Sequence, residues 1–269
     1  MERYQVILAY DGSHFKGYQR QANDRTVQGV VELALRRLQW QGTSILAAGR
    51  TDTGAHATGQ VISFDLTWDH GTADLRQALN KYLPADVAAR EVRQVPATFH
   101  PRYDAAWRKY LYHIYCQPVR QPLLEPYAWR VWPEVDPGIL HGIAAKLIGT
   151  HDFGAFGTPS HSGGNTTRCV LESSWRVADH WLEYEIKAHA FLYHMVRRLV
   201  FIQVRIAQGK MNLTALEHSL QTGSGISLDA AVMNVPGKRL VHGLAPARGL
   251  VLQEVHYPEG VLSSGVDTK

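Results

Sequence analysis

The stretch ILAAGRTDTGAHATGQVISFD, residues 45–65, contains the signals around which the chain is organised. An apolar run fills 45–48 and a nearly alternating run fills 60–65, so both flanks are typical of strands. Between them two glycines bracket Arg50 and Asp52 in a tight turn. Glycine adopts backbone angles that other residues avoid and lets a ligand approach the main chain closely. The stretch therefore predicts two strands joined by a turn that holds a carboxylate beside a guanidinium.

On local chemistry alone, this turn has an ordinary interpretation. Aspartate is common in turns because its side chain hydrogen-bonds its own backbone, so a plain turn is the simpler hypothesis. The wider context favours a catalytic one: GRTDTGAH at 49–56, followed by a strand at Gln60, resembles the GRTDxGVH signature of the TruA family of tRNA pseudouridine synthases. In that family the aspartate is the catalytic nucleophile, a role that falls on Asp52. Thr53 and Ala55 replace the family's usual Ala and Val, and both changes are small.

Further blocks resemble the same family in the same order along the chain. They are YDGSHFKGYQRQ at 10–21, TVQ at 26–28, NKYLP at 80–84, FHPRY at 99–103, RKYLY at 108–112, HDFGAF at 151–156, FLYHMVR at 191–197 and APARGLVL at 245–252. The resemblance implies that Tyr110 packs against the target base. It also implies that Arg197 forms an ion pair with Asp52, and an opposite charge keeps a carboxylate ionised. Phe201 stands where the family usually has Gly, so we expect different helix packing there.

The order of predicted elements favours an α+β fold with antiparallel sheet in both halves, because the long apolar βαβ runs of a parallel sheet are absent. The resemblance adds two ferredoxin-like halves that form a continuous sheet with a central cleft. We expect an N-terminal half at 1–104 that carries the aspartate, a C-terminal half at 105–258 that carries Tyr110 and Arg197, and a disordered polar tail at 259–269. Strands are predicted at 4–10, 87–95, 106–116, 168–177 and 181–188, and helices after the cap Thr26 and at 75–82, 140–148 and 191–207.

Composition limits the class of protein. With 269 residues, 45% of them hydrophobic and 19% charged, the chain is typical of a globular protein with two sub-domains. No apolar run approaches the roughly 20 residues of a membrane span, and the start lacks a signal-peptide layout, so we expect a cytoplasmic protein. The two cysteines lack zinc-ligand spacing, and we expect no metal. A net charge of +4 is compatible with a polyanionic partner if the basic residues cluster.

The segment at 15–21 interleaves aromatic and cationic residues. Phe15 and Tyr18 alternate with Lys16 and Arg20, a pattern that suits RNA because rings stack on bases and cations meet phosphates. A solvated loop is the simpler interpretation of this segment taken alone. Residues 118–137 carry five prolines and are typical of a linker, and 223–243 are expected to be a loop with short elements.

The activity that the resemblance implies needs no cofactor. Pseudouridine formation breaks the N1–C1′ bond of uridine, turns the uracil and joins C5 to C1′, without redox change. The nucleophile attacks either the sugar or the base, and the sequence leaves both open. In the family the targets are positions 38 to 40 of the tRNA anticodon arm, and a homodimer binds one tRNA across two protomers. The target base must leave its stack, and Arg50 is placed to brace the vacated space.

Three other hypotheses remain open at this stage. A non-catalytic tRNA-binding module on the same fold would bind tRNA with a steep salt dependence but isomerise nothing. A hydrolytic glycosidase would need a second carboxylate about 5–9.5 Å from the first, and Asp65, the nearest aspartate in sequence, lies at the far end of a predicted strand. A synthase of the same family with a different RNA target would differ only in the position of its product.

Overall fold

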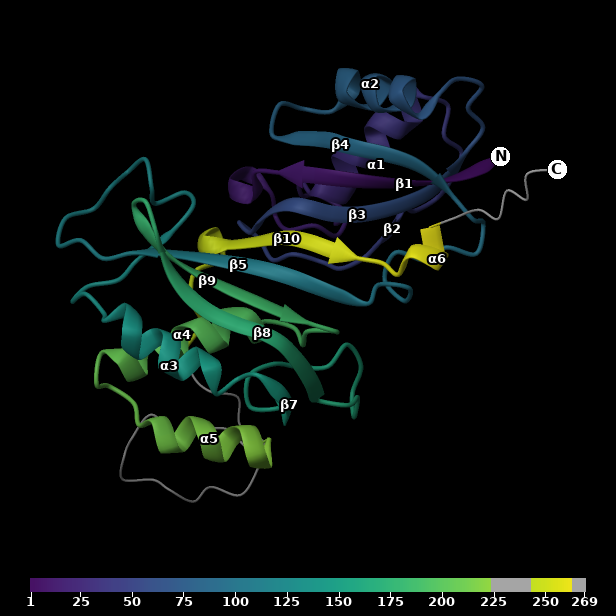
Figure 1. The fold of residues 1–269 in the computed structure, drawn as a ribbon. Coiled ribbons are helices and arrows are strands. Elements are labelled where there is room, and N and C mark those ends of the chain that lie inside the picture. Colours follow the sequence, from purple (N-terminus) through teal and green to yellow (C-terminus); the bar gives the residue numbers. More distant parts are fainter. Residues whose placement is uncertain (224–242, 263–269) are drawn as a thin grey trace. The chain divides into compact units, whose positions relative to one another are not determined.

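The strand–turn–strand arrangement predicted for residues 45–65 is present in the fold. The computed structural model describes residues 1–223 and 243–262. In it, β2 (Leu46–Ala47) pairs with β3 (His56–Leu66) in antiparallel register, with Leu46 opposite Ser63. Figure 1 shows both strands with the rest of the fold. The prediction of two flanking strands is therefore confirmed.

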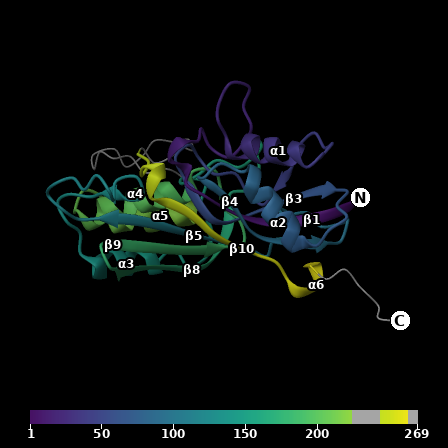
Figure 2. The ribbon, with the colours of Figure 1, turned by 90° about the horizontal axis from the view of Figure 1, so that it is seen from above.

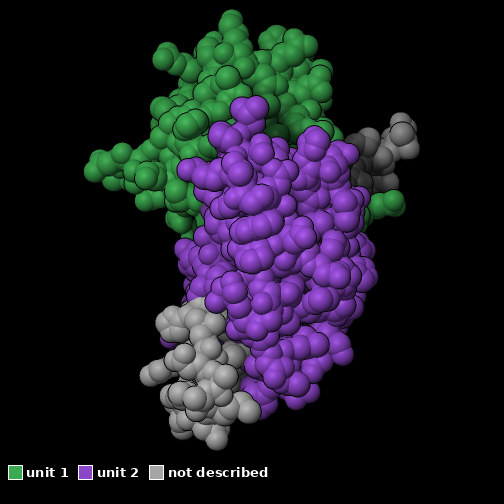
Figure 3. Space-filling view, turned by 90° about the vertical axis from the view of Figure 1, so that its left-hand side faces the viewer, with its two compact units in different colours: residues 1–108, 251–269 green, residues 109–250 purple. Residues whose placement is uncertain are grey.

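The chain folds into two compact units, coloured separately in Figure 3. Unit 1 comprises residues 1–108 and 251–269, and unit 2 comprises 109–250. The units differ from the predicted halves at the C-terminal strand, β10 (Leu250–His256), most of which belongs to unit 1. This strand pairs in parallel with β3, and Gly59 allows the approach, because a Cβ at Gly59 would lie 2.1 Å from the carbonyl oxygen of Gln253.

The first 95 residues of unit 1 form antiparallel strands and two helices in the β-α-β-β-α-β order of a ferredoxin-like fold. Its central strand β1 lies between β3 and β4, and β2 and β10 both pair with β3. Thr26 caps the first helix as predicted, because its hydroxyl accepts a hydrogen bond from the Gly29 amide. The remaining elements of the unit are β1 (Glu2–Tyr10), the 3-10 turn η1 (Gly12–His14), α1 (Val27–Arg37), α2 (Thr72–Tyr82), β4 (Val87–Val95) and the short α6 (Glu259–Leu262).

Unit 2 is built on the strands in the order β5-β9-β8-β7, with β6 beside β5. Figure 2 shows β8 and β9 side by side, and their antiparallel hairpin closes with Ala178 opposite Trp181, as predicted. Helix α3 packs on β8 and contacts α4, and α5 packs on β7. The elements are β5 (Trp107–Tyr115), β6 (Trp129–Arg130), α3 (Pro137–Ala145), β7 (Gly149–Asp152), β8 (Thr167–Ala178), β9 (Trp181–Ala188), α4 (Met195–Ala207), α5 (Leu213–Thr222) and the 3-10 turn η2 (Ala247–Gly249).

The α+β class is thus confirmed, and the pairing within each half is mostly antiparallel, with β10–β3 and β5–β6 as parallel pairs. Several local predictions differ from the structure. The helix predicted at 140–148 is α3 at Pro137–Ala145, and the linker predicted at 118–137 contains β6. The helix predicted from residue 191 begins at Met195, because His194 has a left-handed backbone (φ 65°) and Tyr193 pairs with Thr158 as an isolated bridge. Within the predicted tail, 259–262 form α6, and 263–269 lie outside the described residues, as does most of the loop predicted at 223–243. No helix within 1–223 or 243–262 is both long and apolar enough to cross a bilayer.

The departure from the family pattern at Phe201 has a counterpart in the fold. The Phe201 ring stacks on Trp129 with centroids 6.3 Å apart and planes 13° apart. Gly243 has a φ of +100°, and a Cβ there would lie 2.2 Å from Cε1 of Phe201. The absence of a side chain at Gly243 therefore makes room for the larger ring on α4.

A buried carboxylate joins three strands of unit 2. Glu183 on β9 contacts Nε2 of His113 on β5 at 2.9 Å and also accepts hydrogen bonds from Arg176 on β8. Trp181 stacks on the other side of this network, against the His113 ring. Burial alone would raise the pKa of Glu183, but the bonds from His113 and Arg176 outweigh burial and hold the pKa below its ordinary value of 4.5.

We expect Glu183→Ala to lower the free energy of unfolding by about 3 kcal/mol, the low end of the range for breaking a buried pair, because Arg176 is screened by solvent. The side chain of Glu183 is 8% exposed and that of Arg176 is 65% exposed. A carboxylate with a depressed pKa stabilises the fold above its unfolded-state pKa, and that contribution is lost as pH falls through the folded-state value. Urea unfolding at pH 7 and at progressively lower pH measures both effects.

The matched control for this variant is Glu185→Ala, two residues further along β9. Glu185 forms a half-buried pair with Lys109 at 3.5 Å, so its removal should cost less than about 1 kcal/mol. Equal losses for the two variants, or a difference between native and Glu183→Ala that persists undiminished at low pH, would contradict the proposed role of the buried network.

Candidate active site

Asp52 lies in the turn that leads into β3. Its carbonyl oxygen accepts a hydrogen bond from the Ala55 amide at 3.1 Å, which closes the turn, and Gly54 takes a φ of +80° inside it. Thr51 and Ala55 on either side are buried, whereas Asp52 is half-buried and Arg50 is exposed. The turn therefore keeps its ends fixed in unit 1 while the carboxylate remains accessible.

The segment after β1 holds the residue that precedes Asp52. The amide of Tyr18 donates to the Thr51 carbonyl at 3.0 Å, and the Tyr10 hydroxyl lies 2.7 Å from the Thr51 hydroxyl. Gly17 has a φ of +88°, and a Cβ there would come within 3.1 Å of the same carbonyl oxygen. Thr51 is thus fixed through both its main chain and its side chain.

A second set of contacts holds the far end of the turn. The Gly12 amide donates to Nδ1 of His56 at 3.0 Å, and a Cβ at Gly12 would lie 1.9 Å from the Ala55 carbonyl oxygen. The carboxylate of Asp11 lies 3.2 Å from the same Nδ1. The YDG and GRTDTGAH motifs are therefore one packed unit, a contact that sequence reasoning did not assign.

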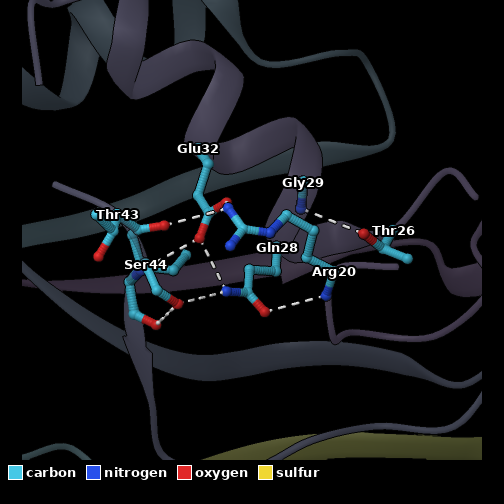
Figure 4. A network of polar contacts seen from close by, with 8 residues as sticks. Arg20, Thr26, Gln28, Gly29, Glu32, Thr43 and Ser44 are labelled. Atoms are coloured by element: carbon cyan, nitrogen blue, oxygen red, sulfur yellow. Dashed lines mark hydrogen bonds and ion pairs between the residues drawn. The ribbon is translucent and has the colours of Figure 1, made fainter. Parts of the chain in front are cut away.

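The start of the motif strand is anchored by a buried polar network on α1 (Figure 4). The Gln28 side-chain amide donates to Glu32 and to Ser44, and its carbonyl accepts from the Arg20 amide at 3.0 Å. Glu32, which is buried, also pairs with the Arg20 guanidinium and accepts from the Ile45 amide at 3.2 Å. The glutamine of the TVQ motif thus connects α1, the end of the 15–21 segment and the residues that enter β2.

The aromatic residues of that segment belong to the core rather than to an exposed surface. Phe15 and Tyr18 are each 2% exposed, so their rings are unavailable to stack on RNA bases. Arg25 lies over the Phe15 ring at 4.1 Å and forms a two-point ion pair with Asp86 at 2.7 and 2.8 Å. The interleaved pattern of rings and cations therefore reflects internal packing, and the RNA-stacking interpretation of these two rings is wrong.

In unit 2, Tyr110 lies half-buried on β5. Its ring meets Phe191 edge-on, with centroids 5.0 Å apart and an interplanar angle of 87°, an arrangement that aromatic pairs favour. Phe191 belongs to the FLYHMVR block, so two blocks that are 81 positions apart meet at this ring. The contact fixes the orientation of Tyr110 while the side chain stays partly accessible.

Arg197 is oriented by the APARGLVL block. Its Nε donates to the carbonyl of Ala245 at 2.8 Å, and the Ala245 amide donates back to the Arg197 carbonyl at 3.3 Å. The adjacent Pro246 carbonyl accepts a hydrogen bond from the Tyr112 hydroxyl at 2.6 Å. Burial raises the pKa of Tyr112, and the positive charges of Arg197 and Arg248 partly oppose that rise.

The predicted site residues are therefore found in two places. Asp52 and Arg50 share the turn of unit 1, and Tyr110 and Arg197 lie in unit 2. Their assembly around one substrate stays a prediction. Tyr10, Thr51, Asp11 and His56 are contacts of the turn that local sequence signals do not reveal.

A partly exposed carboxylate on a turn that is fixed at both ends is suited to catalysis, because catalysis needs a reactive group held in one geometry. The chain belongs to the tRNA pseudouridine synthase family: the sequence model of that family matches residues 6–104 and 143–258. Asp52 and Arg197 lie within the matched ranges, and Tyr110 lies between them. Membership of this family makes the protein an isomerase.

Individual relatives match over nearly their whole length. The tRNA pseudouridine synthase A of Geobacter sp. (strain M21) is 32% identical over 264 residues, covering 96% of this chain and 100% of the relative. That of Thermotoga petrophila is 35% identical and covers 95% of this chain and 99% of the relative. That of Halalkalibacterium halodurans is 36% identical, with 90% and 92% covered.

Proposed function

We propose that the protein converts uridine to pseudouridine at positions 38 to 40 of the anticodon arm of tRNA, with Asp52 as the nucleophile. The observation that supports this best is the Asp52 turn, which carries the family's signature and is fixed at both ends. The names of the relatives, each a tRNA pseudouridine synthase A, support the substrate class.

In the proposed reaction the Asp52 carboxylate forms a covalent bond with the substrate, either at C1′ of the ribose or on the uracil ring. The N1–C1′ bond breaks, the uracil turns, and C5 bonds to C1′. If Asp52 is bonded to C1′, C5 displaces it as the C5–C1′ bond forms; if Asp52 is bonded to the uracil ring, that bond breaks afterwards. C5 loses its proton to solvent and N1 takes one up, so no electrons are gained or lost overall. Arg197 stabilises the carboxylate in its ionised form, because opposite charges favour ionisation.

Two further residues would handle the displaced base. The target must leave its stack, which costs a few kcal/mol, and the exposed Arg50 beside Asp52 is placed to occupy the vacated space. Tyr110 would stack on the uracil and retain it after the glycosidic bond breaks. Its edge-on contact with Phe191 supports this role, because a ring with a fixed orientation costs less entropy to order around a ligand.

The proposal includes a cytoplasmic homodimer that binds one tRNA across both protomers. Modification of several adjacent positions implies recognition of the overall shape of the tRNA rather than of base edges. Light scattering of the free protein and of its complex with tRNA measures the stoichiometry, and a monomer bound to one tRNA would contradict the dimer.

The test of function uses tRNA labelled with tritium at C5 of uridine. Tritium release, together with mapping of the modified positions, is the expected result. A matched tRNA with cytidine at positions 38 to 40 should release none. Absence of release from any tRNA would contradict the activity, and equal release from the cytidine-substituted tRNA would place the targets elsewhere. Free uracil in the product would instead identify a hydrolase.

A further inference from the structure

We infer that Tyr10 is a positioning residue for the reaction, because its hydroxyl holds Thr51 and thereby sets the orientation of Asp52. The inference rests on the proposed function, in which Asp52 is the nucleophile. Tyr10 ends β1, 42 positions before Asp52, and does not itself belong to the turn.

The bond is short and shielded from water. The two hydroxyl oxygens lie 2.7 Å apart, and Tyr10 and Thr51 are 4% and 7% exposed. A hydrogen bond is stronger in a site of low dielectric than in water. Since the Thr51 carbonyl is also held, by the Tyr18 amide, little freedom remains in the residue that precedes Asp52.

The anchor of this bond lies in the sheet of unit 1. Tyr10 pairs with Ala57 of β3 on one side and with Val87 of β4 on the other, so its backbone is fixed within the sheet. Catalytic groups need supporting contacts of this kind, because a displacement of about 1 Å can cost on the order of a hundredfold in rate. The Tyr10 hydroxyl therefore transmits the rigidity of the sheet to the turn.

The chain supplies a matched control in Tyr18. Its ring is buried as deeply as that of Tyr10, at 2% exposed, but its hydroxyl has no hydrogen-bond partner within the part of the chain that the structure describes. Burial raises the pKa of this phenol, which therefore stays neutral. Tyr10→Phe and Tyr18→Phe each remove one hydroxyl from a buried ring of unit 1, but only the first removes a bond to the turn.

The experiment measures single-turnover tritium release from C5-labelled tRNA, with enzyme in excess and saturating. We expect Tyr10→Phe to slow the reaction by about tenfold and to leave the Kd for tRNA within about threefold of native, the pattern of a lost orientation rather than lost binding. Tyr18→Phe should react within about twofold of native, because it removes no bond to the turn.

Variants of the partner make the test specific to the bond. Thr51→Val should slow the reaction about as much as Tyr10→Phe, and the double variant should be no slower than either one, because both remove the same interaction. Thr51→Ser keeps the hydroxyl and should stay within about threefold of native. All rates are measured below the lowest unfolding temperature among the variants. If Tyr10→Phe fails to fold, the difference in rate between Thr51→Val and Thr51→Ser tests the positioning role instead.

Several results would overturn the inference. If packing alone mattered, Tyr10→Phe would behave like Tyr18→Phe, and equal rates for the two would exclude the positioning role. Additive losses in the double variant, or equal losses for Thr51→Val and Thr51→Ser, would do the same. An inactive native protein would instead refute the proposed function, and an active Asp52→Ala would remove the premise. If the native protein is active and Asp52→Ala is inactive, the rates of the Tyr10 and Thr51 variants alone test the positioning role.

Discussion

Asp52→Ala is expected to lower the rate of pseudouridine formation by at least about a hundredfold, which corresponds to roughly 2.7 kcal/mol of transition-state stabilisation. The reason is that the proposed reaction passes through a covalent bond to this carboxylate, and no neighbouring group can replace a missing nucleophile. The turn itself should survive, because its closing bond joins the backbone of Asp52 to Ala55. The affinity for tRNA should therefore stay close to native.

Single-turnover tritium release and filter binding measure these two quantities. The control is Asp65→Asn at the other end of β3, where the carboxylate pairs with Arg3 at 2.7 Å and that hydrogen bond lowers its pKa. This variant should keep native activity. A rate for Asp52→Ala above about a hundredth of native would remove the nucleophile role, and a comparable loss with Asp65→Asn would favour the two-carboxylate hydrolase.

Local signals in the sequence were sufficient for much of the fold. The capping threonine at 26, the proline at 84 and the strand predicted at 87–95 place α1, the end of α2 and β4 correctly, because each depends on residues adjacent in the chain. The start of α4 is different: it is delayed to Met195 by the pairing of Tyr193 with Thr158, 35 positions earlier. The periodicity of residues 191–207 therefore does not predict that contact.

The candidate site likewise combines residues that local signals point to and long-range contacts that they do not predict. Motif resemblance predicts roles for Asp52, Tyr110 and Arg197, but the contacts around them join distant blocks, such as Tyr10 with Thr51 and Arg197 with Ala245. The burial of Phe15 could not be predicted from the sequence either, because rings alternating with cations suit both an RNA surface and a core covered by ion pairs. Tertiary packing decides between such alternatives, and the composition of a segment does not predict whether its rings are buried or exposed.

Arg197→Met is expected to abolish turnover, with a loss of at least about a hundredfold, and to leave tRNA binding largely intact. Methionine retains a long apolar stem on α4 but removes the charge that would stabilise the Asp52 carboxylate in the proposed pair. It also removes the donor to the Ala245 carbonyl. Single-turnover rates at saturating enzyme separate the chemical step from affinity, which filter binding measures directly.

The neighbouring arginine provides the control. Arg198 is also half-buried on α4, but its guanidinium donates to the Phe156 carbonyl at 3.4 Å, so Arg198→Met should retain most of the activity. A loss of affinity for Arg197→Met with an unchanged chemical rate would identify a phosphate contact instead of an ion pair.

Arg197→Lys separates the effect of the charge from that of the guanidinium geometry. Lysine keeps the charge but cannot reproduce the Nε bond to Ala245 together with a second, forked contact. Partial activity in Arg197→Lys and none in Arg197→Met would show that the charge itself supports catalysis, and equal inactivity would show that the fixed orientation of the guanidinium is required as well.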